Sequence, residues 1–100
     1  MELMTKELEK RFEKYPLRSQ DSLGKDARVV VKYFNPFGAG TWLITEGEKQ
    51  EDGDWILYGY CHIVEWEWGE VMLSELQHLG FIERDLYISN TATVRDLCCG

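Results

Sequence analysis

The sequence predicts an α+β fold, in which a mostly antiparallel sheet of about five strands carries an N-terminal helix and one or two short helices, all in one domain over residues 1–100. Runs of β-branched and aromatic residues recur along the chain with short polar links, and short links join antiparallel strands because parallel neighbours need long crossovers. Before the first run, apolar residues repeat at helical spacing. The chain has 100 residues, 44% of them hydrophobic, which is enough for one compact core.

The first predicted element is a helix that starts after Thr5 and runs to about Tyr15. Thr5 is a favourable N-cap, because its hydroxyl can accept from a backbone N–H of the first turn. Leu8 and Phe12 lie four residues apart and form one apolar stripe. Pro16 ends the helix, since the residue before a proline avoids the helical region. The polar segment that follows, to residue 27, is predicted to be a loop.

Alternating and turn-rich segments then predict the strands and a second helix. RVVVKYF and TWLITE flank the turn-rich NPFGAG, as the strands of a hairpin do. A capping box that begins at Ser74 predicts a short helix ended by Gly80, and VRDLCC suggests a short last helix. Residues 65–69 are expected to form a turn or a bulge. The predicted strands cover residues 28–34, 41–46, 55–64, 70–73 and 81–88.

The run WILYGYCHIV, residues 55–64, is apolar on both of its predicted faces. Alternate residues of a strand point to opposite sides. One side therefore carries Trp55, Leu57, Gly59 and Cys61, and the other carries Ile56, Tyr58, Tyr60 and His62. Such a strand is predicted to be internal and covered on both sides, or to have one face bound to a partner.

The charge distribution indicates the class of partner. The formal net charge is −7, and residues 46–70 hold eight acidic residues against Lys49 alone. This field repels nucleic-acid phosphates, so we expect no direct nucleic-acid binding and instead a protein partner with a basic surface. A solvated acidic loop that aids solubility is the alternative interpretation.

Neither a membrane span nor a leader is predicted. No apolar run approaches the roughly 20 residues that a spanning helix needs, and the first residues are charged rather than apolar. We therefore expect a cytoplasmic protein. An exposed edge strand could support a homodimer, so a monomer and a homodimer both remain open.

Four residues form a possible zinc set of the Cys₃His type: Cys61, His62, Cys98 and Cys99. The set lacks the spacing of zinc signatures, in which two or more residues separate paired ligands. In a regular strand Cys61 and His62 point to opposite faces, so both reach one ion only across a bulge. Free thiols are the alternative interpretation, since unpaired Cys is commonly a small buried apolar residue.

No enzymatic activity is expected. Phosphate-loop, dinucleotide and HExxH motifs are absent from the sequence. Neighbours on a strand diverge, so Cys61 and His62 do not form a nucleophile–base pair. Glu83 and Asp85 share a predicted strand face about 7 Å apart, a separation that suits a glycosidase pair. A solvated face with ion pairs to a neighbouring strand is the favoured interpretation.

The segment EWEWGE contains a candidate docking surface. Trp66 and Trp68 flank Glu67 at a predicted strand end, and tryptophan is enriched among the anchors of protein interfaces. The acidic residues Glu51, Asp52 and Asp54 are expected to complete a surface for a basic partner.

Several segments together resemble a known family. They are LMTKEL at the start, WLITEG at Trp42 to Gly47, LYGY at Leu57 to Tyr60, LSEL at Leu73 to Leu76 and IERDLYI at Ile82 to Ile88. In order and spacing they are similar to a bacterial family of unknown function numbered 2958, over about residues 2 to 90. The resemblance implies a small soluble protein of plasmids, prophages and conjugative elements, with no established activity. The Cys61-His62 pair and the CCG ending depart from the family pattern.

Two functions of different classes follow. The first is a non-enzymatic acidic interaction protein that binds a basic surface of a nucleic-acid-handling protein. The mobile-element habit of the resembled family suggests an anti-defence role, such as inhibition of a CRISPR nuclease by occlusion. The second is a small zinc-binding protein that uses the Cys/His set, in a structural or a catalytic role.

Overall fold

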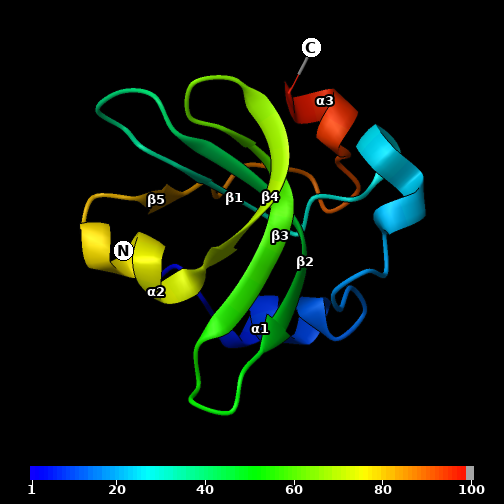
Figure 1. Ribbon diagram of the computed structural model, residues 1–100, viewed down its shortest axis with the longest axis horizontal. Coiled ribbons are helices and arrows are strands. Elements are labelled where there is room, and N and C mark those ends of the chain that lie inside the picture. Colours follow the sequence, from blue (N-terminus) through cyan, green and yellow to red (C-terminus); the bar gives the residue numbers. More distant parts are fainter. Residues whose placement is uncertain (99–100) are drawn as a thin grey trace.

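The computed structural model describes residues 1–98 and contains a five-stranded antiparallel sheet in the order β4-β3-β2-β1-β5 (Figure 1). This confirms the α+β class. The strands are β1 (Val31–Phe34), β2 (Thr41–Lys49), β3 (Trp55–His62), β4 (Trp66–Met72) and β5 (Glu83–Arg84). The helices are α1 (Lys6–Phe12), the 3₁₀ helix η1 (Asp21–Asp26), α2 (Leu73–Leu79) and α3 (Val94–Cys98). Among the residues described, no helix has the length and apolar character that a membrane crossing requires.

One side of the sheet, here called the core face, carries the larger apolar cluster. Ile44 and Leu57 project from this face and are fully buried. α1 and α2 cover them with Phe12 and Leu76, and Tyr33 adds its ring from β1. Burial of this kind contributes roughly 25 cal/mol per Å² of apolar surface, so the core face supplies most of the drive to fold.

The opposite side, here called the groove face, has a smaller apolar cluster. Its centre is Leu43, which packs with Ala27, Val29 and Val94. η1 and α3 lie against each other over this face, and Figure 1 shows them together on the right, in cyan and red. They leave part of β3 and β4 uncovered, where aromatic side chains are only half-buried.

The alternation predicted for residues 55–62 is confirmed. Leu57 and Cys61 pair with Val71 and Glu67 on the core face, while Tyr60 pairs with Leu43 on the groove face. β3 is an internal strand, bonded to β2 on one side and to β4 on the other.

The turn predicted at residues 65–69 is wrong. Trp66 begins β4, which pairs with β3 in an unbroken register from His62↔Trp66 to Ile56↔Met72. The chain turns earlier, at residues 63–65, where Ile63 and Val64 are exposed. Gly69 lies opposite Gly59 within β4 and is therefore part of a strand rather than a turn.

Two predicted strands are shorter in the structure. β1 begins at Val31, because the preceding residues bond elsewhere: Val29 N–H donates to the carbonyl of Ala92. β5 is limited to two residues, since Asp85 turns the chain by accepting from Tyr87 N–H at 2.8 Å. Tyr87 is 94% exposed as a result.

Two helix boundaries also differ from the predictions. α1 ends at Phe12, and tighter turns continue the chain to Tyr15, whose N–H donates to the Phe12 carbonyl. The Ser74 capping box is wrong: α2 begins at Leu73, and the Glu75 carboxylate accepts from Met72 N–H at 2.9 Å.

Ser74 instead contacts the β2–β3 loop. Its hydroxyl and its N–H donate to the carboxylate of Asp54 at 2.5 and 3.0 Å. The same carboxylate accepts from Trp55 N–H at 2.8 Å. These bonds lower the pKa of Asp54, with the Ser74 hydroxyl as the largest cause. Asp54 therefore caps α2 from a distant part of the chain.

Candidate functional site

A row of aromatic side chains, here called the aromatic row, lies on the groove face where β3 pairs with β4. Tyr60 is directly opposite Trp68 and His62 is opposite Trp66, with ring centroids 4.8 and 5.1 Å apart. Diagonal contacts join the pairs: Tyr60 stacks on Trp66 at 5.1 Å and Tyr58 stacks on Trp68 at 5.8 Å. Cross-strand aromatic pairs stabilise a sheet by about 0.2–1 kcal/mol each, so the row holds β4 firmly against β3.

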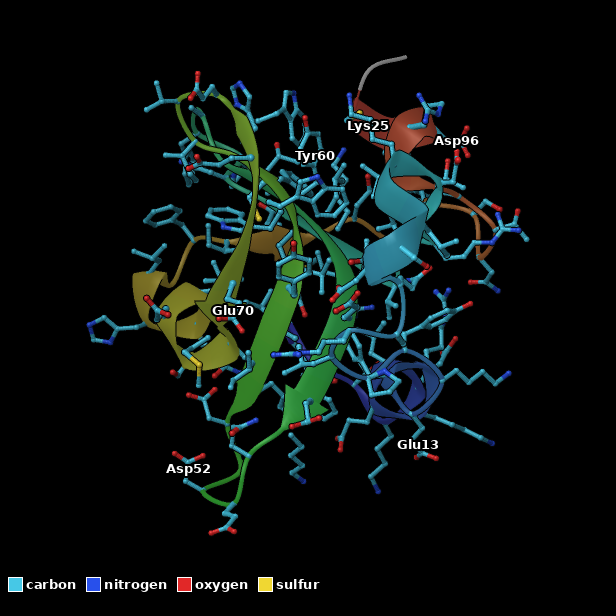
Figure 2. All side chains as sticks on the ribbon, turned by 45° about the vertical axis from the view of Figure 1, so that its right-hand side comes forward. Glu13, Lys25, Asp52, Tyr60, Glu70 and Asp96 are labelled. Carbon is cyan, nitrogen blue, oxygen red and sulfur yellow. The ribbon has the colours of Figure 1, made fainter. Side chains whose placement is uncertain are left out.

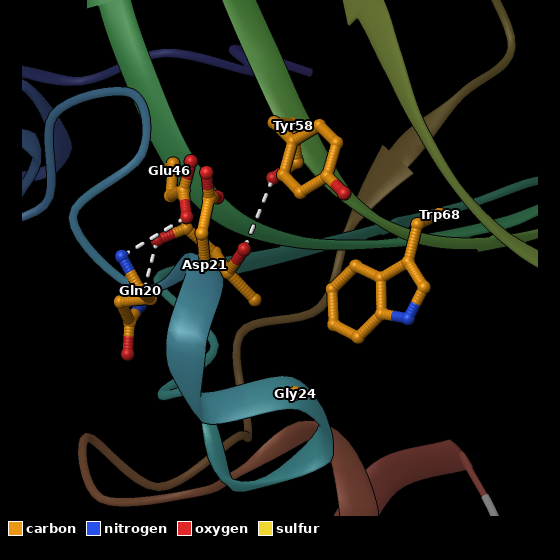
Figure 3. Close-up of a pocket in the computed structure, with 7 residues that line it drawn as sticks. Gln20, Asp21, Gly24, Glu46, Tyr58 and Trp68 are labelled. Atoms are coloured by element: carbon orange, nitrogen blue, oxygen red, sulfur yellow. Dashed lines mark hydrogen bonds between the residues drawn. The ribbon is translucent and has the colours of Figure 1, made fainter.

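A pocket opens between the aromatic row and η1 (Figure 3). Its inner part has a volume of about 150 Å³. It continues into a wider depression of about 460 Å³ toward Leu17, Arg18 and Glu70. Within the described part of the chain, the inner lining combines two carboxyl groups with two aromatic rings and no basic side chain: Gln20, Asp21, Gly24, Thr45, Glu46, Tyr58 and Trp68. We call this the acidic-aromatic pocket.

Glu46 reaches the groove face through a β-bulge in β2. The register between β2 and β3 shifts between Ile44 and Glu46, so Thr45 and Glu46 follow each other without the usual alternation. The Thr45 hydroxyl then donates to the Tyr58 carbonyl at 3.3 Å (Figure 3). In a regular strand Glu46 would point to the same face as Ile44, the core face. The bulge directs it to the groove face instead, where it lines the pocket.

The Glu46 carboxyl is 2% exposed and accepts two backbone hydrogen bonds. Arg18 N–H donates at 2.6 Å and Gln20 N–H donates at 3.0 Å. Burial raises the pKa of Glu46, the two backbone donors oppose that rise, and the neighbouring Asp21 carboxyl adds to it. Glu46 and Asp21 therefore form a carboxyl pair in which burial favours retention of a proton.

Gln20 fixes the segment that leads into η1. Its side-chain nitrogen donates to the carbonyls of Arg28 and Thr45 at 2.9 and 2.8 Å, and its side-chain oxygen accepts from Arg28 N–H at 2.7 Å. The side chain is buried and every one of these bonds is to backbone. Arg18, two residues earlier, has a φ of 76°, a left-handed conformation that is strained in a residue other than glycine. These bonds hold the rim of the pocket in one shape.

The charges around the pocket are mixed at its mouth and negative inside. Asp21 and Glu46 line the inner part, while Glu70 and Arg18 line the outer depression. The Lys25 ammonium lies 5.5 Å from the centroid of the Tyr60 ring, a distance at which a cation is attracted to an aromatic face. The aromatic row therefore already contacts one cation, the Lys25 ammonium, at Tyr60.

The residues predicted for partner binding do not form one surface. Trp66 and Trp68 belong to the aromatic row, but Glu67 points to the core face opposite Cys61. The acidic loop lies at the other end of β3: Figure 2 shows Asp52 at the bottom tip and Tyr60 near the top. Of the loop acids, Asp54 is engaged in capping α2, and Glu51 and Asp52 are exposed.

The predicted zinc residues are also separated. Cys61 pairs with Trp42 on the core face, whereas His62 pairs with Thr41 on the groove face. Burial, aided by the nearby Glu67 carboxylate, raises the pKa of the Cys61 thiol to about 12, and the thiolate is the form that binds metal or attacks a substrate. Cys98 belongs to α3, and Cys99 lies outside the described residues.

Among residues 1–98, no group of three or more Cys, His, Asp or Glu side chains is placed to hold a metal ion. Zinc binding stays a prediction, which metal analysis of the purified protein tests. Asp85 contacts Lys32 of the neighbouring strand, with 3.6 Å between the charged atoms, which agrees with a strand face that forms ion pairs to its neighbour.

Of the residues that line the inner pocket, sequence reasoning identified Trp68 alone, and the acidic and aromatic residues that it missed are Asp21, Glu46 and Tyr58. Asp21 was part of a predicted loop, and Glu46 was counted with the acidic segment. One signal was present: Glu46 follows the apolar run WLIT directly, where a solvated loop residue is unexpected. The contact of η1 with this strand joins residues 26 positions apart, between Gln20 and Glu46, and no local pattern encodes it.

Comparison with known proteins yields a family and no activity. A family model described as "Protein of unknown function (DUF2958)" matches residues 3–97. No curated protein and no solved structure matches the chain.

Proposed function

Because the chain belongs to the DUF2958 family of proteins of unknown function, we propose a function from the chemistry of its pocket: a non-enzymatic binding protein that receives a cationic side chain of a basic protein partner. The observation that carries the proposal is the inner lining of the acidic-aromatic pocket, where the exposed Asp21 carboxyl lies with the rings of Tyr58 and Trp68 and the Glu46 carboxyl is buried. Arginine and lysine are the side chains attracted by both groups, through ion pairing and through the negative face of the rings.

The size of the pocket supports a side chain rather than a small-molecule substrate. The inner part, about 150 Å³, is smaller than the roughly 300–1,000 Å³ of sites that enclose a drug-sized ligand. The wider outer depression leaves room for the rest of a partner segment. Trp68 is 37% exposed at the boundary, so it can contact an incoming group without a change in the fold.

The bonding of Glu46 supports a binding role over an acid–base role. Both of its oxygens accept from backbone N–H groups, and the side chain is buried beneath the pocket. A general base must reach the proton it abstracts from a substrate. Asp21 and Glu70 are exposed and remain available to contact a cation.

A narrower form of the proposal places the partner among nucleic-acid-handling proteins, whose basic grooves complement a net charge of −7. An anti-defence inhibitor that occludes the groove of a CRISPR nuclease is one such case. In that form, added duplex DNA should compete with the protein for its partner, and the partner's cleavage of DNA should fall as the protein is titrated in. Binding that is indifferent to added DNA would contradict the narrower form alone.

We expect Trp68→Ala and Glu70→Gln to weaken the binding of a short arginine-rich peptide by about tenfold and about three- to fivefold, respectively. The first removes a ring that a guanidinium would contact, and the second removes one charge at the pocket mouth. The measurement is fluorescence anisotropy of the labelled peptide at about 0.1 M salt, where the Debye length is about 10 Å. Thermal melts check that Trp68→Ala remains folded.

The matched control is Glu51→Gln, which removes the same charge from the exposed loop at the far end of β3. We expect it to change the affinity less than about twofold, because exposed charges beyond a Debye length are screened. Equal weakening by Glu51→Gln and Glu70→Gln would show that the peptide senses only net charge, and the proposed pocket would then be wrong.

A further inference from the structure

β4 is an edge strand with an open outer side. It bonds to β3 along seven residue pairs, from His62↔Trp66 to Ile56↔Met72, and ends the sheet. Among the described residues, no backbone hydrogen bond joins β4 to any other loop or element. The opposite edge differs: β5 has two residues, and the Arg84 side chain there donates to the Glu2 carbonyl at 3.1 Å. Of the two sheet edges within residues 1–98, the β4 edge alone is long enough to pair with another strand.

The N–H groups that point outward from β4 can be assigned. Met72 N–H donates to the Glu75 carboxylate, so it points away from β3. In an antiparallel sheet the direction of the N–H group alternates from residue to residue. The N–H groups of Glu70, Trp68 and Trp66 therefore also point outward, while those of Val71, Gly69 and Glu67 point toward β3. This agrees with the close ring contacts of Trp66 and Trp68, which are typical of pairs that do not share ladder bonds.

The edge lacks three of the usual protections against strand addition. Edge strands are commonly blocked by lysine, proline or a bulge, and the segment WEWGEVM has no lysine and no proline, while its register with β3 is regular. Its charges are all acidic: Glu67 on the core face, Glu70 on the groove face and Glu65 in the preceding turn. The backbone of the β4 edge is therefore free to pair with another strand, and its acidic side chains favour a basic one.

We propose that β4 receives an extended, basic segment of a partner protein as a sixth strand of the sheet. This inference rests on the proposed function and supplies its geometry. Alternate side chains of an added strand lie about 7 Å apart on one face. Those on the groove face run beside Trp66, Trp68 and Glu70, and those on the core face run beside Glu67. Lysine or arginine at alternate positions would all lie on one face of the added strand, and each face of β4 offers an acid: Glu70 on the groove face and Glu67 on the core face. A side chain beside Trp68 would be directed toward the acidic-aromatic pocket.

The acidic charge of β4 disfavours a second copy of this chain as the strand that pairs with its edge. Two β4 edges paired with each other would double the acidic side chains on both faces of the joined sheet, Glu67 on the core face and Glu70 on the groove face, with no basic side chain from either strand. Like charges on facing strands are destabilising. A basic segment instead neutralises them. We therefore expect a monomer in light scattering.

The test uses a short peptide with arginine and lysine at alternate positions and valine and threonine between them, added to the wild-type protein. Two further peptides carry N-methyl groups, one on the amides of the basic residues and the other on the amides of the residues between. A strand pairs along one side only. We therefore expect one methylated peptide to bind about as the parent does and the other at least about tenfold more weakly. Electrostatic attraction alone produces no such asymmetry.

Substitutions in the protein provide a second test of strand addition. Glu70→Pro removes an outward N–H and a charge, whereas Glu70→Gln removes the charge alone. Proline is tolerated on an edge where its missing donor faces solvent, and thermal melts check the fold. We expect Glu70→Pro to weaken the parent peptide at least about fivefold more than Glu70→Gln does.

The outcomes separate the two proposals. Binding that depends on Trp68 but is equal for all three peptides would overturn strand addition and leave the proposed function standing. No binding of the parent peptide would overturn both. A stable dimer that dissociates in Glu70→Pro would identify a second copy as the occupant and overturn the basic partner strand. Asymmetric loss on methylation together with a monomeric protein supports the inference.

Discussion

Gly59→Ala is expected to destabilise the fold by about 4 kcal/mol or more, a large part of the roughly 5–15 kcal/mol that stabilises a domain. A Cβ atom at this position would lie 1.9 Å from the Leu43 carbonyl oxygen and 2.8 Å from the Ile44 Cα. Both are backbone atoms of the adjacent strand, so no side-chain rotation can relieve the clash. The two strands would have to separate, and with them the contacts of Ile44 and Leu57 in the core.

The matched control is Gly69→Ala on β4. Gly69 is directly opposite Gly59 in the sheet, yet a Cβ there would meet no atom within 4 Å. We expect a change of less than about 1 kcal/mol, within the range of ordinary surface substitutions. Urea denaturation of both variants measures the difference. A Gly59→Ala protein as stable as Gly69→Ala would contradict the close approach of β2 and β3.

Glu46→Ala is expected to destabilise the protein by about 2–5 kcal/mol, because two buried backbone N–H groups lose their acceptor and each unsatisfied donor costs about 1–3 kcal/mol. The N–H of Arg18 belongs to a residue with a φ of 76°, so the bond to Glu46 also holds a strained turn. The N–H of Gln20 anchors the start of η1. Loss of both bonds should loosen η1 from the sheet and open the acidic-aromatic pocket.

Glu48→Ala is the control for this substitution. Glu48 follows two residues later on the same strand and is exposed, so its loss should change stability by less than about 0.5 kcal/mol. Glu46→Gln should lie between the two, since an amide retains one acceptor oxygen and replaces the other with a donor. Urea denaturation ranks the three variants. Equal stability of Glu46→Ala and Glu48→Ala would contradict the hydrogen bonds assigned to Glu46.

The pH dependence of stability provides a separate check on Glu46. Burial raises its pKa in the folded state above the ordinary value of 4.5. At pH values between the unfolded-state and folded-state pKa of Glu46, the folded protein binds more protons than the unfolded protein. The contribution of Glu46 to the free energy of unfolding is therefore fully present at low pH and is lost as the pH rises through the raised pKa. The stability of the wild type relative to Glu46→Gln should therefore fall as the pH rises above about 4.5. A difference that is constant or rises with pH would contradict a raised pKa.

Local sequence patterns predicted much of the fold, and they also predicted that Cys61 and His62 point to opposite faces of their strand. The alternation of residues 55–62 follows from the two-residue period of a strand, so the division of Cys61 and His62 between two faces was predictable from sequence alone. Short polar links predicted antiparallel pairing for the same reason: they are too short for a crossover. These conclusions depend on neighbours in the chain and were confirmed.

Features that depend on distant residues were mispredicted or missed. Trp66 to Gly69 resembled a turn because glycine and charged residues follow the tryptophans, but pairing with β3 makes the segment a strand. Ser74 resembled an N-cap, but Asp54 occupies its hydroxyl from the β2–β3 loop. In both cases a contact with another element overrode the preference of the local segment, as tertiary context commonly does.

The sequence by itself determined the α+β class, the antiparallel order of hairpins, the two-faced apolar character of β3 and the acidic character of the chain. These properties follow from periodicity, link length and charge, which are written in consecutive residues. Only the tertiary structure decided that Glu46 is buried, that Asp21 and Trp68 meet across a pocket and that β4 is an open edge. Burial and strand order are set by which distant segments pack together, because the free energy of desolvation depends on neighbours in space rather than in sequence.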